Sequence, residues 1–183
     1  MPTDSATPTA RSARRRLKRL IDDQTAERSD EMYVQDREAI QKLARSAVEA
    51  FDDKKSQMNK LERMALSAST FGTIADYVKS QMGRDTETGD AWAEDFGETL
   101  LDKLDEHRRS VPNDTERLLS AMDGSLVAQL VGGEEENEED SDGPPERIRR
   151  TVSRRLRLGY AQAFVGHVVA EYDYKVSIQA DQS

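Results

Sequence analysis

The stretch from Pro144 to Lys175 constrains the fold most, because apolar side chains recur in it at every fourth position. The series comprises Ile148, Val152, Leu156, Tyr160, Phe164, Val168 and Tyr172. Residues four apart lie on one face of an α-helix. Pro145 suits the first helical turn, where a missing N–H costs nothing. The spacing therefore predicts one helix of about 28 residues, which is about 42 Å long.

The two halves of this predicted helix differ in character. The first half carries six arginines, which are Arg147, Arg149, Arg150, Arg154, Arg155 and Arg157. The second half is apolar on more than one face. It also holds small residues that let other helices approach its backbone closely, namely Gly159, Ala161, Ala163 and Gly166. The stretch therefore predicts a helical domain with a basic surface.

The rest of the chain also has helical periodicity. No segment shows the sustained two-residue alternation that is typical of a half-buried strand. Apolar positions spaced three and four apart run through 33–51, 61–68, 74–82 and 92–104. We therefore predict an all-α fold, a single compact bundle of about six helices. Its core should contain both strong stripes, which are Trp92, Phe96, Leu100, Leu104, Tyr160, Phe164 and Val168.

Capping residues and a proline predict where helices begin and end. Ser29 or Asp30 should cap the helix over 33–51, and Thr70 should cap a short helix that stops at Gly83. The helix that carries the 92–104 pattern should end near Arg109, because Pro112 lacks the N–H that a helix interior needs. A further short helix should then follow, up to Gly124.

Two segments lack the apolar residues that packing requires. Residues 1–13 are rich in Thr, Ser, Ala and Pro, and residues 134–142 hold seven acids and no base. Both compositions are typical of disorder. We expect a disordered tail (1–13), a helical bundle (14–131), a disordered acidic linker (132–143), a long helix packed on the bundle (144–176) and a tail (177–183). Within the bundle, residues 14–26 can form a short basic helix that is too poor in apolar residues to pack firmly.

The charge of the chain is strongly segregated. The formal net charge is −9, yet residues 1–20 carry six Arg or Lys against one Asp, and residues 146–157 carry six Arg against one Glu. Such segregation favours a partner of one sign of charge. The chain has no cysteine. It also has no apolar segment typical of a secretory signal or a membrane span, so we expect a cytoplasmic protein.

Signals of enzymatic chemistry are poor. The chain has two histidines, His107 and His167. We expect His107, near a helix end, to be solvated or to interact with the C-terminal end of the helix dipole. We expect His167 to be packed in the core or in an interface. Neither has the spacing to a second His, a Cys or a Glu that zinc sites use, and no glycine-rich phosphate loop or nucleophile elbow is present. We therefore expect no catalytic residue, metal or cofactor.

The arginine cluster is the stronger functional signal, because the planar guanidinium fork suits phosphate. The candidate nucleic-acid-binding residues are Arg147, Arg149, Arg150, Arg154, Arg155 and Arg157, extended by Lys54, Lys55, Arg63 and Lys79. Three other roles stay open at this point: a solvated surface, neutralisation by the acidic linker, and an acidic protein partner.

Several pieces of the chain, taken in order, resemble the small helical subunit of type III CRISPR effector complexes. These pieces are the turn and short helix over 70–79, the apolar helix at 100–101 followed by the Leu-Leu helix over 118–124, and the passage from arginine to Ala and Phe over 154–165. The similarity spans about residues 37–172. The basic N-terminal extension and the acidic linker depart from the family's usual pattern.

The resemblance implies a compact, non-catalytic protein that serves in antiviral defence. Copies of it would stack along a crRNA–target duplex, contacting RNA backbone and other protein subunits, with possible self-association. The alternative is a helical adaptor or regulator that binds only protein, with its arginines on an acidic surface. Neither interpretation involves a membrane or a small-molecule substrate.

Overall fold

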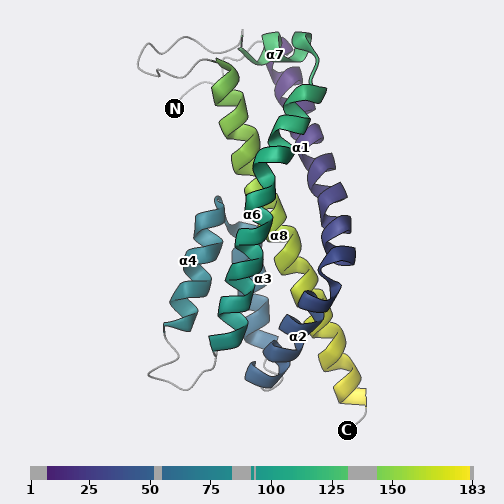
Figure 1. Ribbon diagram of the computed structural model, residues 1–183, viewed down its shortest axis with the longest axis vertical. Coiled ribbons are helices and arrows are strands. Elements are labelled where there is room, and N and C mark those ends of the chain that lie inside the picture. The colour runs from purple at the N-terminus through teal and green to yellow at the C-terminus, as the bar shows by residue number, and fades with distance from the viewer. Residues whose placement is uncertain (1–7, 52–54, 84–91, 93, 132–143, 182–183) are drawn as a thin grey trace.

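A computed structural model describes residues 8–51, 55–83, 92, 94–131 and 144–181 of the chain (Figure 1). Every regular element in these ranges is an α-helix, which confirms the predicted all-α class. Seven helices are present there, rather than about six. They are α1 (Pro8–Gln35), α2 (Arg37–Phe51), α3 (Lys55–Ser67), α4 (Phe71–Met82), α6 (Glu94–Ala121), α7 (Gly124–Val131) and α8 (Pro144–Asp181).

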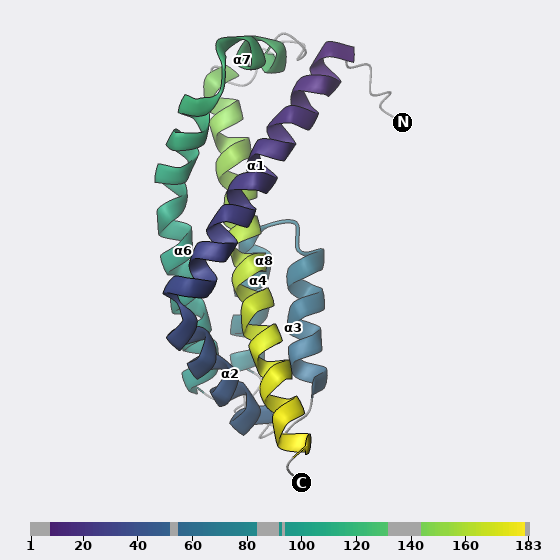
Figure 2. The same cartoon turned by 90° about the vertical axis from the view of Figure 1, so that its right-hand side faces the viewer.

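Helix α8 runs the length of the molecule and is in contact with every other helix described (Figures 1 and 2). The predicted stripe explains this position. Ile148 is partly buried, and each later member of the stripe is fully buried, from Val152 to Tyr172. Helix α8 continues to Asp181, beyond the predicted end at residue 176. One helix with an apolar face along most of its length thus organises the bundle.

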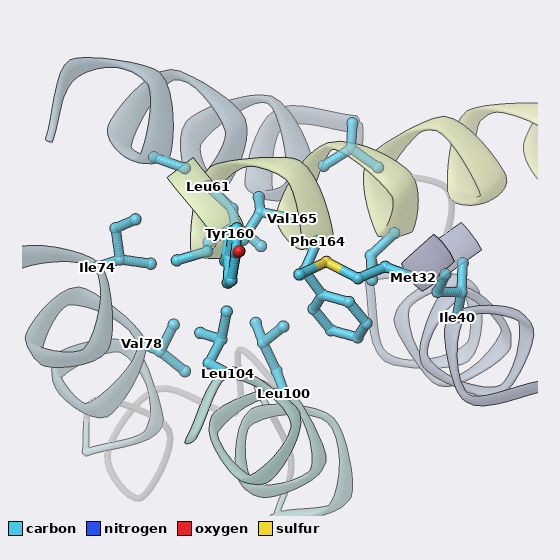
Figure 3. Packing of buried hydrophobic residues seen from close by; sticks show 14 of the residues in the cluster. Met32, Ile40, Leu61, Ile74, Val78, Leu100, Leu104, Tyr160, Phe164 and Val165 are labelled. Carbon is cyan, nitrogen blue, oxygen red and sulfur yellow. The ribbon is translucent and has the colours of Figure 1, made fainter. Parts of the chain in front are cut away.

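The predicted core is confirmed. Trp92, which lies just before α6, and the stripes of α6 and α8 belong to one buried cluster. Leu100 and Leu104 from α6 lie beside Phe164 and Tyr160 from α8, with Ile74 and Val78 of α4 nearby (Figure 3). Burial of each large apolar side chain contributes about 1.5–3 kcal/mol.

The predicted cap of α4 is also confirmed, whereas the predicted cap before residue 33 is wrong. The backbone N–H of Thr73 donates to Thr70 Oγ1 at 3.2 Å. Ser29 and Asp30 lie inside α1, and the chain turns only at Asp36. The Ser29 hydroxyl lies 3.0 Å from His167 Nε2 on α8, so it makes a tertiary contact instead of capping a helix.

Helix α1 extends further and packs more firmly than predicted. It begins at Pro8, so residues 8–13 are helical, and residues 1–7 lie outside the described residues. Ala10, Ala13, Leu17 and Ile21 are buried along one face. Two of these four are alanines, whose small side chains allow close helix packing but give a weak apolar signal. The predicted linker 132–143 and residues 182–183 also lie outside the described residues.

Pro112 does not end the preceding helix, contrary to the prediction. Helix α6 continues through it to Ala121. An internal proline costs about 3 kcal/mol, because it removes a hydrogen bond and crowds the preceding turn. Val111 and Leu118 are buried on either side of the proline, whose own ring is exposed. Burial of this turn offsets the local cost, which the local sequence alone does not reveal.

Two glycines of α8 provide a matched test of the packing between α1 and α8. A Cβ atom on Gly159 would lie 2.8 Å from Thr25 Cγ2, whereas a Cβ on Gly166 would meet nothing within 4 Å. Gly166→Ala should stabilise the fold by about 0.5–1 kcal/mol, because glycine is a poor helix former. In Gly159→Ala the same gain should be cancelled, because the new methyl group crowds Thr25 and such overpacking costs about 1–3 kcal/mol. Thermal unfolding of both variants checks this; equal shifts would show that α1 does not pack closely at Gly159.

Candidate nucleic-acid interface

Two basic segments that are far apart in sequence lie at the same end of the bundle. The first half of α1 lies beside the first half of α8, next to α7 and the last turns of α6 (Figures 1 and 2). We call this region the basic end. Its basic residues are Arg11, Arg14, Arg15, Arg16, Lys18 and Arg19 of α1 and Arg147, Arg149, Arg150, Arg154, Arg155 and Arg157 of α8.

An ion pair and a helix cap fix α7 at this end. Asp123 precedes α7 and accepts the backbone N–H of Leu126 at 2.7 Å. Its other carboxylate oxygen pairs with Arg16 of α1 at 2.8 Å. The backbone hydrogen bond from Leu126 and the nearby Arg16 charge lower the pKa of Asp123. One carboxylate therefore links α1 to the start of α7.

The helical register of α8 explains why its arginines face outward. Val152 and Leu156 are fully buried against the bundle. The positions between them must then point to the two flanks of this face or to solvent. All the arginines of this half are exposed except Arg147, which is half-buried. Two concave surfaces result, one on each flank of α8.

The first of these surfaces, the α1–α8 pocket, has a volume of about 310 Å³. On α8, Arg147, Thr151 and Arg155 form one row at four-residue spacing, and Arg14 of α1 also lines the pocket. Four apolar residues complete the lining, namely Leu17, Leu130, Val131 and Ile148. The pocket therefore combines positive charge with an apolar wall.

The second surface, the α6–α8 groove, has a volume of about 300 Å³ and is polar. Its lining residues are Pro112, Thr115, Glu116, Glu146, Arg149, Arg150, Ser153, Arg154 and Arg157. Arg149 is already paired, with Glu116 at 2.6 Å and Glu146 at 3.3 Å. Arg154 and Arg157 are exposed, and neither forms an ion pair with another described residue. These two arginines can therefore bind an external anion without breaking an ion pair to any residue that the structure describes.

The structure does not bring the other predicted basic residues to this end. Lys55 and Lys79 are exposed but lie on α3 and α4, which pack beside the second half of α8 (Figure 1). Arg63 is exposed on α3 as well, while Lys54 lies outside the described residues. Of the predicted binding residues, only the α8 arginines therefore lie at the candidate site. Arg14 was not predicted as part of it, although the basic composition of residues 1–20 was a visible signal.

His107 is buried, so the prediction of a solvated histidine is wrong. The expected helix end near Arg109 does not exist, and His107 therefore sits inside α6, facing α8. Its ring centroid is 4.9 Å from that of Phe164, and its Nε2 is 3.4 Å from Asp36 Oδ2. Lys103 Nζ donates to the same carboxylate at 2.9 Å. Burial lowers the pKa of His107, against an opposing effect from Asp36.

This buried histidine predicts loss of stability in mild acid. A histidine with a lowered pKa in the folded protein gains its proton more readily in the unfolded chain. The contribution of His107 to stability should therefore be constant above neutral pH. It should fall as the pH drops below 6.5, the ordinary pKa of histidine. Asp36, Arg28, Glu106 and Lys103 set the charge around the ring.

Melting temperatures between about pH 7.5 and 5.5 measure this effect, a range in which histidine titrates. His107→Leu should flatten the profile, whereas His167→Gln should retain the loss because His107 is intact. A profile that is unchanged by His107→Leu would contradict the assignment.

His167 packs against α1, as predicted, and is not a base for a serine nucleophile. Its Nε2 lies 3.0 Å from both the hydroxyl and the backbone carbonyl oxygen of Ser29. A carbonyl oxygen only accepts hydrogen bonds, so Nε2 must carry the hydrogen. It therefore cannot take the Ser29 proton. Tyr33 covers the ring at 5.3 Å between centroids, which fits a structural role.

Other kinds of site find no support in the part of the chain that the structure describes. No group of three or more His, Cys, Asp or Glu residues in those ranges could hold a metal ion. No helix there is both long and apolar enough to span a bilayer. Comparisons with models of protein families, with curated proteins and with solved structures gave no match.

Proposed function

We propose that the protein is a non-catalytic RNA-binding subunit of a ribonucleoprotein, and that its basic end contacts the RNA backbone. This is the role implied by the resemblance to the small helical subunit of type III CRISPR complexes. One observation carries the proposal: α1 and α8 each contribute a run of basic residues to the same end of the bundle. Arg154 and Arg157 there have no internal carboxylate partner among the described residues.

The chemistry of this surface favours phosphate over a sequence-specific ligand. Guanidinium groups bind phosphate oxygens through paired N–H donors. Phosphate contacts fix the position of a nucleic acid but carry no sequence information. The net charge of −9 repels a polyanion as a whole, so the isolated chain should bind RNA weakly. Binding should strengthen when neighbouring subunits align several basic ends along one strand.

A pair of matched charge reversals tests the proposal. Arg154→Glu/Arg157→Glu alters the α6–α8 groove, and Lys55→Glu/Lys79→Glu alters exposed lysines beside the other half of α8. Both double variants have the same net charge, so the long-range field changes equally. The first should weaken binding of single-stranded RNA at least tenfold, since each charged hydrogen bond contributes about 1.5–3 kcal/mol. The second should weaken it far less; fluorescence anisotropy measures both.

Two outcomes would contradict the proposal. Equal losses in the two variants would show that RNA responds only to overall charge and that the basic end is no special surface. Intact binding in both variants, alone and in a complex, would favour the adaptor that binds an acidic protein. Circular dichroism of each variant checks that the helices remain folded.

A further inference from the structure

The α1–α8 pocket differs chemically from the α6–α8 groove, although both are lined by arginines of α8. The groove is polar, with Ser, Thr and two Glu among its lining residues. Half of the residues that line the pocket are apolar, and three of these four, Leu130, Val131 and Ile148, are partly exposed. A surface meant only for phosphate needs no such wall. The pocket therefore suits a ligand with both an anionic and an apolar part.

The size of the pocket limits this ligand to one small unit. Sites for single small molecules have volumes of about 300–1,000 Å³. The pocket, at about 310 Å³, lies at the lower end of this range. Arg155 is exposed at its edge, and Thr151 lies one turn before it on the same row. An anionic group can therefore stay near solvent while a flat apolar group lies against Leu130 and Ile148.

We propose that the α1–α8 pocket receives one unpaired nucleotide of the bound RNA. The base lies against the apolar wall, and the adjoining phosphate contacts the pocket arginines. This inference rests on the proposed function and specifies its substrate as RNA with an unpaired base. Guanidinium planes stack on the face of any base, and an aliphatic wall shields a base from water without contacting its hydrogen-bonding edges in a specific pattern. The pocket therefore distinguishes unpaired from paired RNA rather than one sequence from another.

Base pairing explains why the α1–α8 pocket would not accept a nucleotide of an RNA duplex. The bases of an A-form helix are stacked inside it, and their faces are not available to a protein pocket. A duplex can still place its phosphates along the α6–α8 groove. The two surfaces on the flanks of α8 should therefore separate two properties: affinity for phosphate and selectivity for single strands.

A pair of matched substitutions on α8 tests the proposal with the full chain. Thr151→Phe fills the pocket, and Ser153→Phe adds the same side chain to the opposite flank. The ligands are an unstructured oligoribonucleotide and the blunt duplex made by annealing it to its complement. Thr151→Phe should weaken single-strand binding about tenfold, the effect of losing one stacked base, and leave duplex binding unchanged. Ser153→Phe should leave the ratio of the two affinities as it is in the unaltered chain.

Mononucleotides provide a second measurement that requires no variant. Adenosine 5′-monophosphate and ribose 5-phosphate carry the same phosphate, but only the first has a base. The unaltered chain should bind the nucleotide more tightly by calorimetry. Equal affinities would overturn the inference, as would a Thr151→Phe variant that weakens duplex and single-strand binding alike or leaves both intact. Equal, salt-sensitive binding of both RNAs to the unaltered chain would reject the nucleotide pocket but keep the backbone proposal, whereas no RNA binding would reject both.

Discussion

Replacing Phe164 by alanine is expected to destabilise the fold by about 3–5 kcal/mol, the usual cost of removing a central aromatic side chain. Phe164 is fully buried on α8, and its ring is 4.9 Å from His107 on α6. Leu100 of α6 and Met32 of α1 lie beside it (Figure 3). The cavity would therefore open between three helices that cannot collapse onto it independently. For a chain of this size the melting temperature should fall by roughly 6–20 °C.

Tyr174→Ala is the matched control, because it also removes an aromatic ring from α8. Tyr174 is 61% exposed, so its loss should change stability by no more than about 0.5 kcal/mol. Urea unfolding of both variants gives the two free energies. A cost below about 1 kcal/mol for Phe164→Ala, or similar costs for both, would mean that α8 is not the centre of the core.

The central packing could be predicted from the sequence because its signal is periodic and strong. The apolar residues at every fourth position of α8 and α6 form a continuous stripe, and such a stripe is buried against neighbouring helices in a folded domain. The start of the short helix α4 could be predicted because threonine is a common N-cap residue. Thr70 Oγ1 does accept the backbone N–H of Thr73, at 3.2 Å.

The errors arose where tertiary packing overrides a local rule. Pro112 disfavours an isolated helix, but α6 continues through it, with Val111 buried just before the proline and Leu118 buried further along. That single error also misplaced His107, which was expected near a helix end and is instead inside α6. Helix α1 was underestimated because Ala10 and Ala13 give almost no hydrophobic signal, although small residues let two helices approach closely.

The candidate site could be predicted only in part. Charge clustering in α8 is visible along the sequence, but which other basic residues join it depends on topology. Composition alone does not separate Lys55 and Lys79, which were predicted, from Arg14, which was not. The parallel course of α1 and α8 brings Arg14 beside Arg147 and Arg155, and α3 and α4 lie beside the other half of α8 (Figure 2).

Salt should weaken RNA binding steeply if the basic end contacts the backbone. Each phosphate that an arginine neutralises on a single strand releases condensed counterions and contributes about −0.7 to the log–log slope of affinity against salt. Five arginines of α8 are exposed: Arg149, Arg150, Arg154, Arg155 and Arg157. If each contacts one phosphate, the slope is about −3.5, and affinity falls about 100-fold between 50 and 200 mM salt.

The most direct measurement is this slope for the unaltered chain and for Arg154→Gln/Arg157→Gln, which removes two contacts without adding negative charge. Anisotropy titrations of a single-stranded RNA over a series of salt concentrations provide both values. The slope of this variant should be shallower by about 1.4, whereas the slope of Lys55→Gln/Lys79→Gln should equal that of the unaltered chain. A slope near zero for the unaltered chain, or the same slope for all three proteins, would contradict the claim that the basic end binds the RNA backbone.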